Sequence, residues 1–263
     1  MQTENITNHI VKWLKDYATN AGVNGFVIGV SGGIDSAVTS TLCAKTGFPL
    51  LCLEMPIHQA ENQVSRAMNH IQWLQENFND VSIKQVNLTP VFDSLIDAFP
   101  SVENEEQRFM SLANTRARLR MTSLYYFAAL NGYLVAGTGN KVEDFGVGFF
   151  TKYGDGGVDL SPIADLMKSE VYKIAKYLGI HDEIIKAAPT DGLWGDDRTD
   201  EDQIGASYDE LEWAMLMLEQ GKNIEEFDGR AKKVLEIYLQ RHNANKHKMD
   251  AIPVCMIPKA LKG

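Results

Sequence analysis

The sequence predicts an α/β protein with a doubly wound parallel sheet and a helical C-terminal extension, and three observations support this fold class. Short apolar runs typical of buried strands lie at 25–30, 49–55, 81–88 and 133–137. Segments with apolar residues three and four positions apart, typical of amphipathic helices, alternate with these runs. After residue 137 only helical patterns recur. Alternating strands and helices form parallel sheets covered by helices on both faces, so we expect one such sheet.

The spacing of apolar residues predicts each helix and strand in turn. The first helix is expected over 4–18, where Ile6, Ile10 and Leu14 share one face. A second helix should follow the run 31–36 and continue to about residue 45. Further helices are expected over 61–76, 105–130, 167–178, 207–220 and 230–242. The third strand, 81–88, is more polar than the others, which places it nearer an edge of the sheet.

Composition excludes several classes of protein. The 263 residues are 44% hydrophobic and 23% charged, which is ordinary for a globular chain and unlike a disordered one. No apolar run approaches the ~20 residues of a membrane span, and the N-terminus lacks the basic and apolar parts of a signal peptide. Three widely spaced cysteines give neither a disulfide framework nor a zinc pattern. We therefore expect a single cytoplasmic domain over 1–263.

The net charge of −10 is concentrated in one region of the chain. Residues 191–228 hold thirteen acidic and two basic side chains, whereas the remaining sequence is close to neutral. A protein without a basic face is a poor candidate for binding nucleic acid. Residues 192–204 form the start of this acidic region and are expected to be an exposed loop that closes over a ligand as a lid.

The strongest chemical signal is the run Gly29-Val30-Ser31-Gly32-Gly33-Ile34-Asp35-Ser36 between the first strand and the second helix. Small residues let backbone N–H groups approach an anion, and the N-terminus of the following helix favours negative charge. The run lacks the lysine of a Walker A loop and the glycine spacing of a dinucleotide fingerprint. A tight turn with Asp35 as a helix cap is the structural alternative. Inside a phosphate loop, an aspartate requires an intervening cation, which indicates Mg²⁺.

A second glycine-rich stretch follows the fourth strand. Residues 137–162 contain seven glycines and few periodic apolar positions. A long loop of this kind in a compact domain usually serves a function. On a helix over 105–130, Arg116 and Arg120 would share one face and Arg118 would point to the opposite side, so the three cannot bind one ligand together.

The loop 29–36 resembles that of the ATP pyrophosphatases, which include NAD, GMP and asparagine synthetases and several tRNA-modifying enzymes. The later segments Gly137–Glu143, Gly148–Asp159 and Leu166–Lys168 look like NAD synthetase, as do Pro189-Thr190 and His247-Lys248. They occur in the order of that family over about 25–255. The resemblance implies a flavodoxin- or Rossmann-like sheet of the adenine nucleotide α-hydrolase type.

The resemblance also implies a reaction. Deamido-NAD, ATP and ammonia would give NAD, AMP and pyrophosphate, the last step of NAD biosynthesis. A carboxylate does not react with ammonia at neutral pH, so attack on the α-phosphate of ATP first makes an acyl adenylate, from which AMP leaves readily. Mg²⁺ would neutralise the departing pyrophosphate. The ammonia-dependent branch of the family carries no glutaminase domain, and the sequence shows none.

The family's motifs assign roles to individual residues of this chain. Asp35 and Glu143 would be the Mg²⁺ ligands, and Asp155 would accept a proton from ammonium so that free ammonia attacks. For Asp155, a turn in Gly-Asp-Gly-Gly is an equally good interpretation. The residues implied to contact ATP are Gly29, Val30, Ser31, Gly32, Gly33, Ile34, Asp35, Ser36, Thr138, Lys168 and Thr190. The residues implied to contact deamido-NAD are Arg118, Lys152, Asp159, His247 and Lys248.

The resemblance further implies a homodimer with deamido-NAD at the interface, to which the helices 4–18 and 105–130 could contribute apolar surface. Two other hypotheses stay open. The first is another ATP pyrophosphatase, such as a GMP synthetase ATP-binding subunit or a tRNA-modifying enzyme. The second is a non-catalytic nucleotide sensor, against which the presence of Asp35, Glu143 and Lys168 argues.

Overall fold

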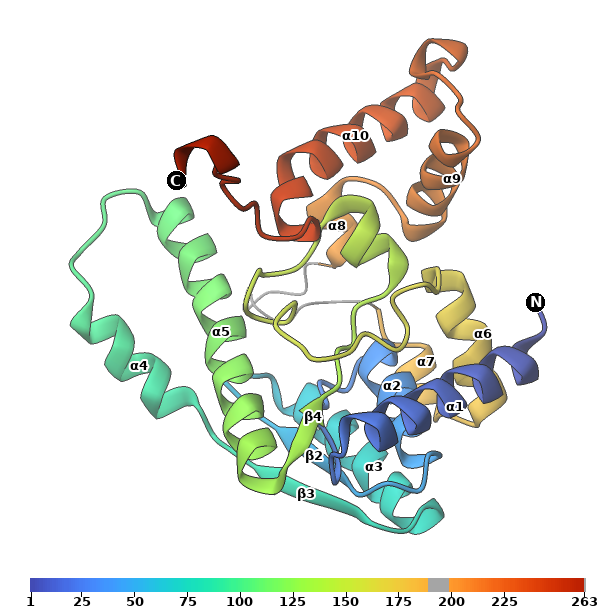
Figure 1. Ribbon diagram of the computed structural model, residues 1–263, viewed down its shortest axis with the longest axis vertical. Helices are drawn as coiled ribbons and strands as arrows, with labels where there is room; N and C mark the ends of the chain where they lie inside the picture. The colour runs from blue at the N-terminus through green and yellow to red at the C-terminus, as the bar shows by residue number, and fades with distance from the viewer. Residues whose placement is uncertain (189–198, 263) are drawn as a thin grey trace.

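The sheet of the protein has four parallel strands in the order β3-β2-β1-β4. We describe a computed structural model, which defines residues 1–188 and 199–262. The strands are β1 (Gly25–Gly29), β2 (Leu50–Glu54), β3 (Val81–Gln85) and β4 (Tyr133–Val135). The polar strand β3 lies at an edge, as its composition predicted. The parallel sheet and the helices around it confirm the predicted α/β fold class (Figure 1).

Helices cover both faces of the sheet because its central strands are apolar on both sides. Phe26 and Ile28 point into one core, and Val27, between them, points into the other. Strand β2 repeats this alternation, as the period-two geometry of a strand requires. The first core is completed by α1 (Thr3–Ala21), α2 (Ile34–Ala44), α3 (Glu61–Asn77) and α6 (Lys168–Leu178). The second is completed by α4 (Thr89–Ala98) and α5 (Glu105–Asn131).

The long helix α5 has clear signals at both ends. The side chain of Asn104 accepts a hydrogen bond from the backbone N–H of Gln107 and caps the first turn. At the other end Gly132 adopts φ +66°, a left-handed conformation that glycine enters without a steric penalty. The chain then enters β4 directly, beside β1.

The strand order reverses direction between β1 and β4, and the carboxyl ends of these two strands mark the reversal point. The chain moves outward from β1 to β2 and β3 on one side and returns to β4 on the other. Loops that follow β1 and β4 therefore diverge at the carboxyl edge, which is where ligands bind in open α/β sheets. Both glycine-rich stretches, the loop 30–33 and the segment 136–162, begin at this edge.

A third, smaller core joins the C-terminal helices. It contains Leu211, Met215 and Leu235, together with Val142 and Val147 from the glycine-rich stretch. The elements that form it are η1 (Val142–Val147), α8 (Asp200–Ile204), α9 (Tyr208–Glu219), η2 (Ile224–Glu226) and α10 (Gly229–Met249). These helices sit beyond the carboxyl edge of the sheet, above the binding region (Figure 1). The predicted helical C-terminal extension is confirmed.

Several elements differ from the sequence prediction. Residues 137–162 are not one continuous loop, because Val142–Val147 form a π-helix, η1. Helix α10 continues to Met249, about two turns beyond the expected end. Two short helices were missed, α4 and α7 (Asp182–Ile185), and α8 occupies part of the expected lid. Short or irregular helices carry too few periodic positions to be recognised in a sequence.

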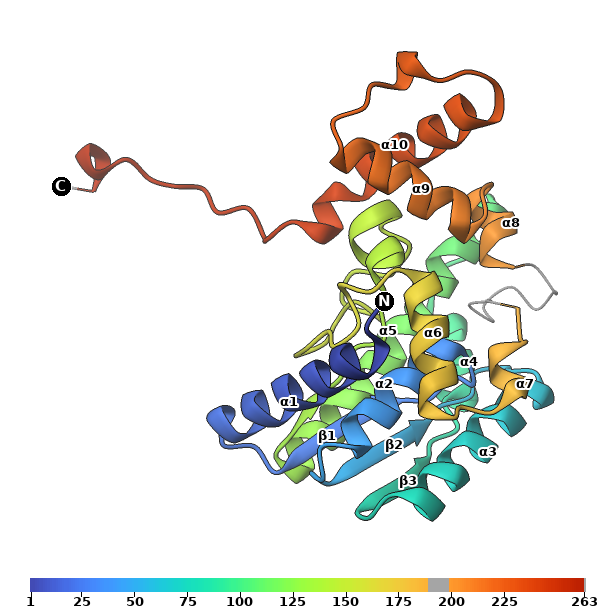
Figure 2. The ribbon, with the colours of Figure 1, turned by 90° about the vertical axis from the view of Figure 1, so that its right-hand side faces the viewer.

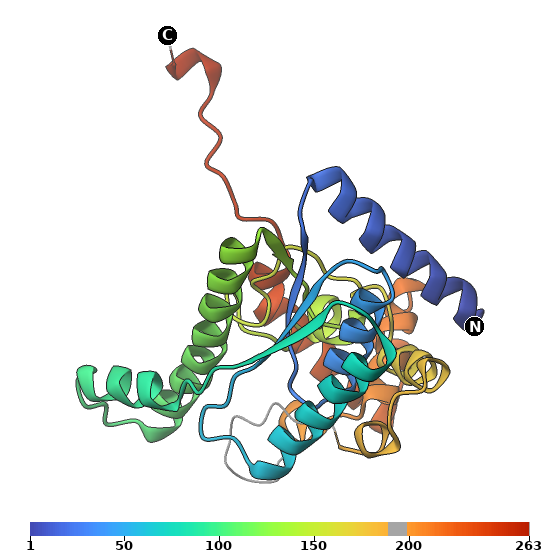
Figure 3. The same cartoon turned by 90° about the horizontal axis from the view of Figure 1, so that it is seen from below.

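The C-terminal segment after α10 extends away from the body (Figures 2 and 3). It ends in the short helix η3 (Lys259–Leu261) and exposes Ile252, Val254 and Met256 to 65%, 74% and 82%. Cys255 in this segment is also exposed, whereas Cys43 and Cys52 are buried in the core as predicted. In the described part of the chain, no helix is both long and apolar enough to span a bilayer.

Candidate active site

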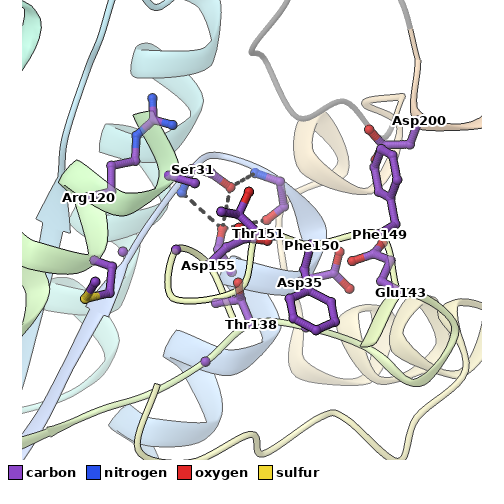
Figure 4. Close-up of a pocket in the computed structure, with 18 of the residues that line it drawn as sticks. Ser31, Asp35, Arg120, Thr138, Glu143, Phe149, Phe150, Thr151, Asp155 and Asp200 are labelled. Atoms are coloured by element: carbon purple, nitrogen blue, oxygen red, sulfur yellow. Dashed lines mark hydrogen bonds between the residues drawn. The ribbon is translucent and has the colours of Figure 1, made fainter. Parts of the chain in front are cut away.

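A cavity of about 620 Å³ opens at the carboxyl edge of the sheet. Its floor is the loop after β1 and the start of α2, one wall is α5, and the opposite wall is η1 and the C-terminal helices. Figure 4 shows Ser31, Asp35, Thr138, Glu143 and Asp155 turned toward this space. The predicted phosphate loop, both predicted metal ligands and Asp155 therefore share one cavity.

The phosphate loop is held open by its two serines. Ser36 Oγ donates to the carbonyl of Gly33 at 2.9 Å and accepts from the backbone N–H of Ser31 at 3.2 Å. The two hydroxyls lie 3.2 Å apart. No side chain of the described chain caps α2, so the N–H groups of its first turn are available to an anion.

Gly32 fixes the path of this loop. Its φ of +80° is a left-handed conformation, and an added Cβ would lie 2.8 Å from the carbonyl of Gln63 in α3. Arg66 of the same helix donates from Nε to the Gly32 carbonyl at 3.4 Å. The loop is therefore packed against α3 so closely that only glycine fits.

A buried lysine bridges the two predicted metal ligands. Lys168, the first residue of α6, is 3% exposed, and its Nζ lies 2.6 Å from Asp35 Oδ2 and 3.0 Å from Glu143 Oε1. The three residues come from the N-terminus of α2, from η1 and from α6. Because one ammonium contacts both carboxylates, the space between them accommodates a cation.

The protonation equilibria of these groups reflect burial and mutual attraction. Burial raises the pKa of Asp35, and the nearby Lys168 offsets this only in part. Burial would also raise the pKa of Glu143, but Lys168 and the hydroxyl of Tyr208 outweigh it and bring the pKa below its ordinary value. Burial lowers the pKa of Lys168, yet the two carboxylates reverse this, so the pKa is raised and the lysine stays charged. The cluster therefore favours an ionised Glu143 beside a permanent cation.

Asn140 connects the two carboxylates and was not assigned a role from the sequence. It is fully buried, its Nδ2 donates to Asp35 Oδ1 at 3.3 Å, and its Oδ1 accepts from the backbone N–H groups of Val142 and Glu143 at 3.1 Å. One amide thus orients the Asp35 side chain and the backbone of Glu143. The only hint of this role in the sequence was that Asn140 lies three residues before Glu143.

Asp144 is a further acid in the cavity that the sequence did not single out. Burial, together with the nearby charges of Glu143, Asp155 and Asp35, raises the pKa of Asp144 to about 8. An added Cβ on Gly139 would lie 2.2 Å from its carboxylate oxygens, so glycine at 139 makes room for this acid. At neutral pH most Asp144 side chains are therefore protonated.

Asp155 is folded back onto its own loop. Its Oδ1 accepts from the backbone N–H of Thr151 at 2.9 Å, and the hydroxyl of Thr151 donates to Asn114 of α5 at 2.6 Å. Although Asp155 faces solvent through the cavity, the surrounding protein displaces much of its water, and this burial raises its pKa. The geometry supports both interpretations of the sequence, since Asp155 is a turn residue and an acid in the cavity.

The end of α10 holds the glycine-rich stretch in place. Lys248 donates from Nζ to the carbonyls of Gly148 and Phe150, the latter at 2.7 Å, and Asn245 donates to the carbonyl of Val147 at 2.9 Å. Lys248 also lines the cavity. In this structure it stabilises the wall of the cavity through backbone contacts.

Three other predicted contacts of deamido-NAD lie together at the surface: Arg118, Lys152 and His247. Arg118 donates to the carbonyl of Lys152 at 3.3 Å, and Lys152 donates from Nζ to the carbonyl of His247 at 2.6 Å. Arg118 and His247 are exposed. Arg120, on the other side of α5, instead reaches the carbonyl of Met55 and the side chain of Gln59, as the helical spacing predicted.

Asp159 is occupied by structural contacts. Its Oδ2 accepts from the backbone N–H of Val135 at 2.8 Å, and its Oδ1 accepts from the hydroxyl of Tyr125 at 3.0 Å. These bonds tie β4 to α5 and to the glycine-rich stretch. Of the other predicted residues, Thr138 lines the cavity, whereas Thr190 and residues 192–198 of the expected lid lie outside the described residues.

Comparison with known proteins agrees with this geometry. The family model described as NAD synthase matches residues 6–251. The chain belongs to the NAD synthase family. It is 36% identical over 257 residues to the NH₃-dependent NAD⁺ synthetase of Carboxydothermus hydrogenoformans, which covers 95% of this chain and 98% of that protein. The family predicted from the sequence motifs is thereby confirmed, and the GMP synthetase and tRNA-modification alternatives are set aside.

Two solved structures are similar over nearly the whole chain. The NMN synthetase of Francisella tularensis is 32% identical with a TM-score of 0.82, and the match covers 98% of this chain and 99% of that one. The NH₃-dependent NAD synthetase of Campylobacter jejuni is 27% identical with a TM-score of 0.78, covering 97% and 100%. Both likenesses extend through the sheet and the C-terminal helices.

Proposed function

We propose that this protein amidates deamido-NAD with ammonia in an ATP-dependent reaction, giving NAD, AMP and pyrophosphate. The observation that carries the proposal is the buried cluster of Asp35, Glu143 and Lys168 at the mouth of the phosphate loop, in a chain of the NAD synthase family. The family's enzymes are ligases, and relatives that this chain matches over nearly their full length are NH₃-dependent NAD⁺ synthetases.

The residues of the cavity suit the first half of this reaction. The N–H groups of the α2 N-terminus and the hydroxyls of Ser31 and Ser36 bind the phosphates, and Lys168 supplies a positive charge next to them. The carboxylate of deamido-NAD attacks the α-phosphate of ATP, a P–O bond forms, and pyrophosphate leaves with the bonding electron pair. The product is an acyl adenylate. Charges fixed in advance around the departing phosphates lower the barrier to this step.

Asp35 and Glu143 are the residues that would hold Mg²⁺. Among the described residues, no group of three or more His, Cys, Asp and Glu side chains is arranged to hold a metal ion. Two carboxylates that already share one cation, Lys168, nevertheless fit Mg²⁺, which typically takes one or two carboxylates and completes its shell with water and substrate phosphates. When bound, Mg²⁺ would neutralise the negative charge that builds up on the departing pyrophosphate.

Asp155 serves the second half of the reaction. Ammonium is not nucleophilic, so a base near the acyl adenylate must take one of its protons. Asp155 lies in the cavity, and burial raises its pKa, which makes it a stronger base than an ordinary aspartate. Free ammonia then attacks the acyl carbon, AMP leaves with the electron pair of the broken C–O bond, and the new amide nitrogen releases its extra proton to water.

The second substrate contacts the surface formed by Arg118, Lys152 and His247. The positive charges of Arg118 and Lys152 suit the diphosphate of deamido-NAD, and the surface adjoins the cavity through Lys248. We assign Asp159 a supporting role, because both of its oxygens are engaged with Val135 and Tyr125.

A homodimer would complete this exposed side of the site. Apolar residues that a monomer leaves in water support this: Tyr126 and Leu130 on α5 are 62% and 67% exposed, and the extended C-terminal segment exposes several more. Exposed apolar groups of this size typically mark an interface. Light scattering at working concentration should give twice the chain mass, and a monomer would contradict the proposal. We place the enzyme in the cytoplasm, where ATP is available.

A second candidate substrate follows from one comparison. A structural neighbour that covers almost all of this chain is an NMN synthetase. Amidation of nicotinic acid mononucleotide uses the same carboxylate chemistry on a substrate without the adenosine half. The buried cluster serves both substrates equally, so only the exposed surface would distinguish them.

The test supplies the purified protein with ATP, Mg²⁺ and ammonium chloride, and either deamido-NAD or nicotinic acid mononucleotide. Chromatography measures the amide product, AMP and pyrophosphate. We expect NAD, AMP and pyrophosphate in equal amounts, with a higher kcat/KM for deamido-NAD than for the mononucleotide. A higher kcat/KM for the mononucleotide would establish the second candidate, and no product from either substrate would refute the proposed function. Glutamine in place of ammonium should give no product, which tests the expectation that no glutaminase is present.

A further inference from the structure

Tyr208 joins the C-terminal helices to the carboxylate cluster, and no motif assigned it a role. It is the first residue of α9, is 6% exposed and packs in the third core, which joins the C-terminal helices. Its hydroxyl donates to Glu143 Oε1 at 2.6 Å and lies 3.3 Å from Asp200 Oδ2, at the start of α8. The hydroxyl has one proton, and the shorter contact is to Glu143. A phenol bonded to a carboxylate at this distance forms a strong, charge-assisted hydrogen bond.

Glu143 has a particular need for such a partner. It lies in the π-helix η1, a wider turn than an α-helix and one often found at functional sites. Its backbone N–H is held by Asn140, but its side-chain oxygen Oε1 is held by Lys168 and Tyr208 together. Two donors of different kinds, one charged and one neutral, therefore converge on one carboxylate oxygen.

The two donors differ in what happens when a second cation arrives. Lys168 contacts Asp35 and Glu143 simultaneously, so a cation that binds between these carboxylates competes with the ammonium for the same oxygens. Tyr208 carries no charge. Its neutral hydroxyl reaches Glu143 Oε1 from the first residue of α9, a different element from the one that carries Lys168. It can continue to orient Glu143 whether or not a metal ion is present.

The aromatic ring of Tyr208 has a separate contact. Lys168 Nζ lies 4.6 Å from the ring centroid, within the range of a cation–π interaction. Replacing Tyr208 by phenylalanine would preserve this contact and the packing of the ring, and would remove only the hydroxyl. The two parts of the side chain can thus be tested separately.

We propose that Tyr208 is a positioning residue that orients Glu143 for Mg²⁺, and that through it α8 and α9 stabilise the metal-binding geometry. This inference rests on the proposed function only in assigning Mg²⁺ to Asp35 and Glu143. Groups that orient metal ligands typically contribute about 10- to 100-fold to metal affinity or activity. The effect of Tyr208 should therefore appear in Mg²⁺-dependent binding of ATP and not in binding of ATP itself.

The experiment measures ATP binding by isothermal titration calorimetry, without deamido-NAD, once with Mg²⁺ and once with EDTA. For Tyr208→Phe we expect the Kd for ATP to rise about tenfold with Mg²⁺ and less than twofold with EDTA. Tyr238→Phe is the matched control, because Tyr238 is 5% exposed in the same core and stacks on His242, away from the carboxylates. It should change neither Kd.

A second comparison shows whether Tyr208 acts through Glu143. In a Glu143→Gln background, Tyr208→Phe should cause no further loss of Mg²⁺-dependent ATP binding. Equal losses with Mg²⁺ and EDTA, or no loss with Mg²⁺, would overturn the proposal, as would additive losses in the double variant. These outcomes do not involve deamido-NAD, so they are distinct from a failure of the proposed reaction, in which the wild-type protein would make no NAD.

Discussion

The two halves of the binding region are built differently. On one side, Asp35, Glu143 and Lys168 are held inside the protein, and their charges satisfy one another. On the other side, Arg118 and Lys152 donate to backbone carbonyls, and Arg118 is exposed. The first half is assembled before any ligand arrives, whereas the second can exchange its carbonyl contacts for those of a ligand. The fixed arrangement of charges is thus concentrated where negative charge develops during adenylyl transfer.

Removing Lys168 from the buried half should have the largest effect on activity and stability. Lys168→Met leaves two carboxylates in the cluster without their shared cation, so we expect kcat/KM to fall about 1000-fold and the free energy of unfolding to fall by about 3 kcal/mol. Mg²⁺ can occupy the space of the lost ammonium, and it should stabilise the variant more than the wild type. Urea unfolding with and without Mg²⁺ measures this, and equal stabilisation of both proteins would contradict the assignment.

The next largest effect on activity is expected for Asp155, which lies in the cavity. Asp155→Asn should reduce kcat about 100-fold at neutral pH because it removes the proton acceptor for ammonium. Since its pKa is raised, wild-type Asp155 should lose its proton, and become an effective base, only at a pH above the ordinary aspartate range. Activity of the wild type should therefore fall on acidification before ordinary carboxylates titrate.

The pH dependence of the variant provides the check. Below the pKa of ammonium, the rate of Asp155→Asn should rise with pH in proportion to the fraction of free ammonia. A variant with the wild-type pH profile and rate would show that Asp155 is only a turn residue, held by the N–H of Thr151.

Removing a side chain of the exposed half should have a smaller effect on activity. It should change KM for deamido-NAD and leave kcat nearly unchanged. Arg118→Ala should raise KM for deamido-NAD about tenfold, the cost of one hydrogen bond to a charged group, with little change in kcat or in KM for ATP. Arg108→Ala is the control, because Arg108 lies on the same helix and its guanidinium pairs with Glu105, one turn away. An equal rise in KM for ATP would show that the two halves are not separate.

Asp159→Asn should have the smallest effect on catalysis. The two oxygens of Asp159 accept from Val135 and Tyr125, and an asparagine has only one oxygen to offer. We expect the free energy of unfolding to fall by about 1–2 kcal/mol, and KM for deamido-NAD to change little. Asp165→Asn is the control, since this residue is fully exposed. A large rise in KM for deamido-NAD without loss of stability would show instead that Asp159 contacts this substrate.

The phosphate loop of the buried half carries a signal in its own residues, whereas the exposed half was assigned only through the family resemblance. The loop 29–36 combines small residues, hydroxyls and one aspartate in a short run, and such local constraints can be read from the sequence alone. The roles of Asn140 and Tyr208 could not be, because their contacts depend on which helices pack over η1. Single polar residues in a helix or loop give no periodic signal.

Asp159 is a different case, because the family resemblance alone implied that it contacts deamido-NAD. In the structure its carboxylate accepts from the backbone N–H of Val135, at the end of β4, and from the hydroxyl of Tyr125. The π-helix η1 was also missed, since one extra residue in a turn does not change composition. Long apolar patterns, by contrast, predicted the four strands and the main helices correctly, because burial on both faces of the sheet leaves few alternatives.

The central claim is that the carboxylate of deamido-NAD is activated on the α-phosphate of ATP in the buried half of the site. Deamido-NAD labelled with ¹⁸O in its carboxylate tests this directly when the products formed with ATP, Mg²⁺ and ammonium are analysed by mass spectrometry. The account predicts one ¹⁸O atom in AMP and none in pyrophosphate. Unlabelled AMP, or label in pyrophosphate, would contradict it.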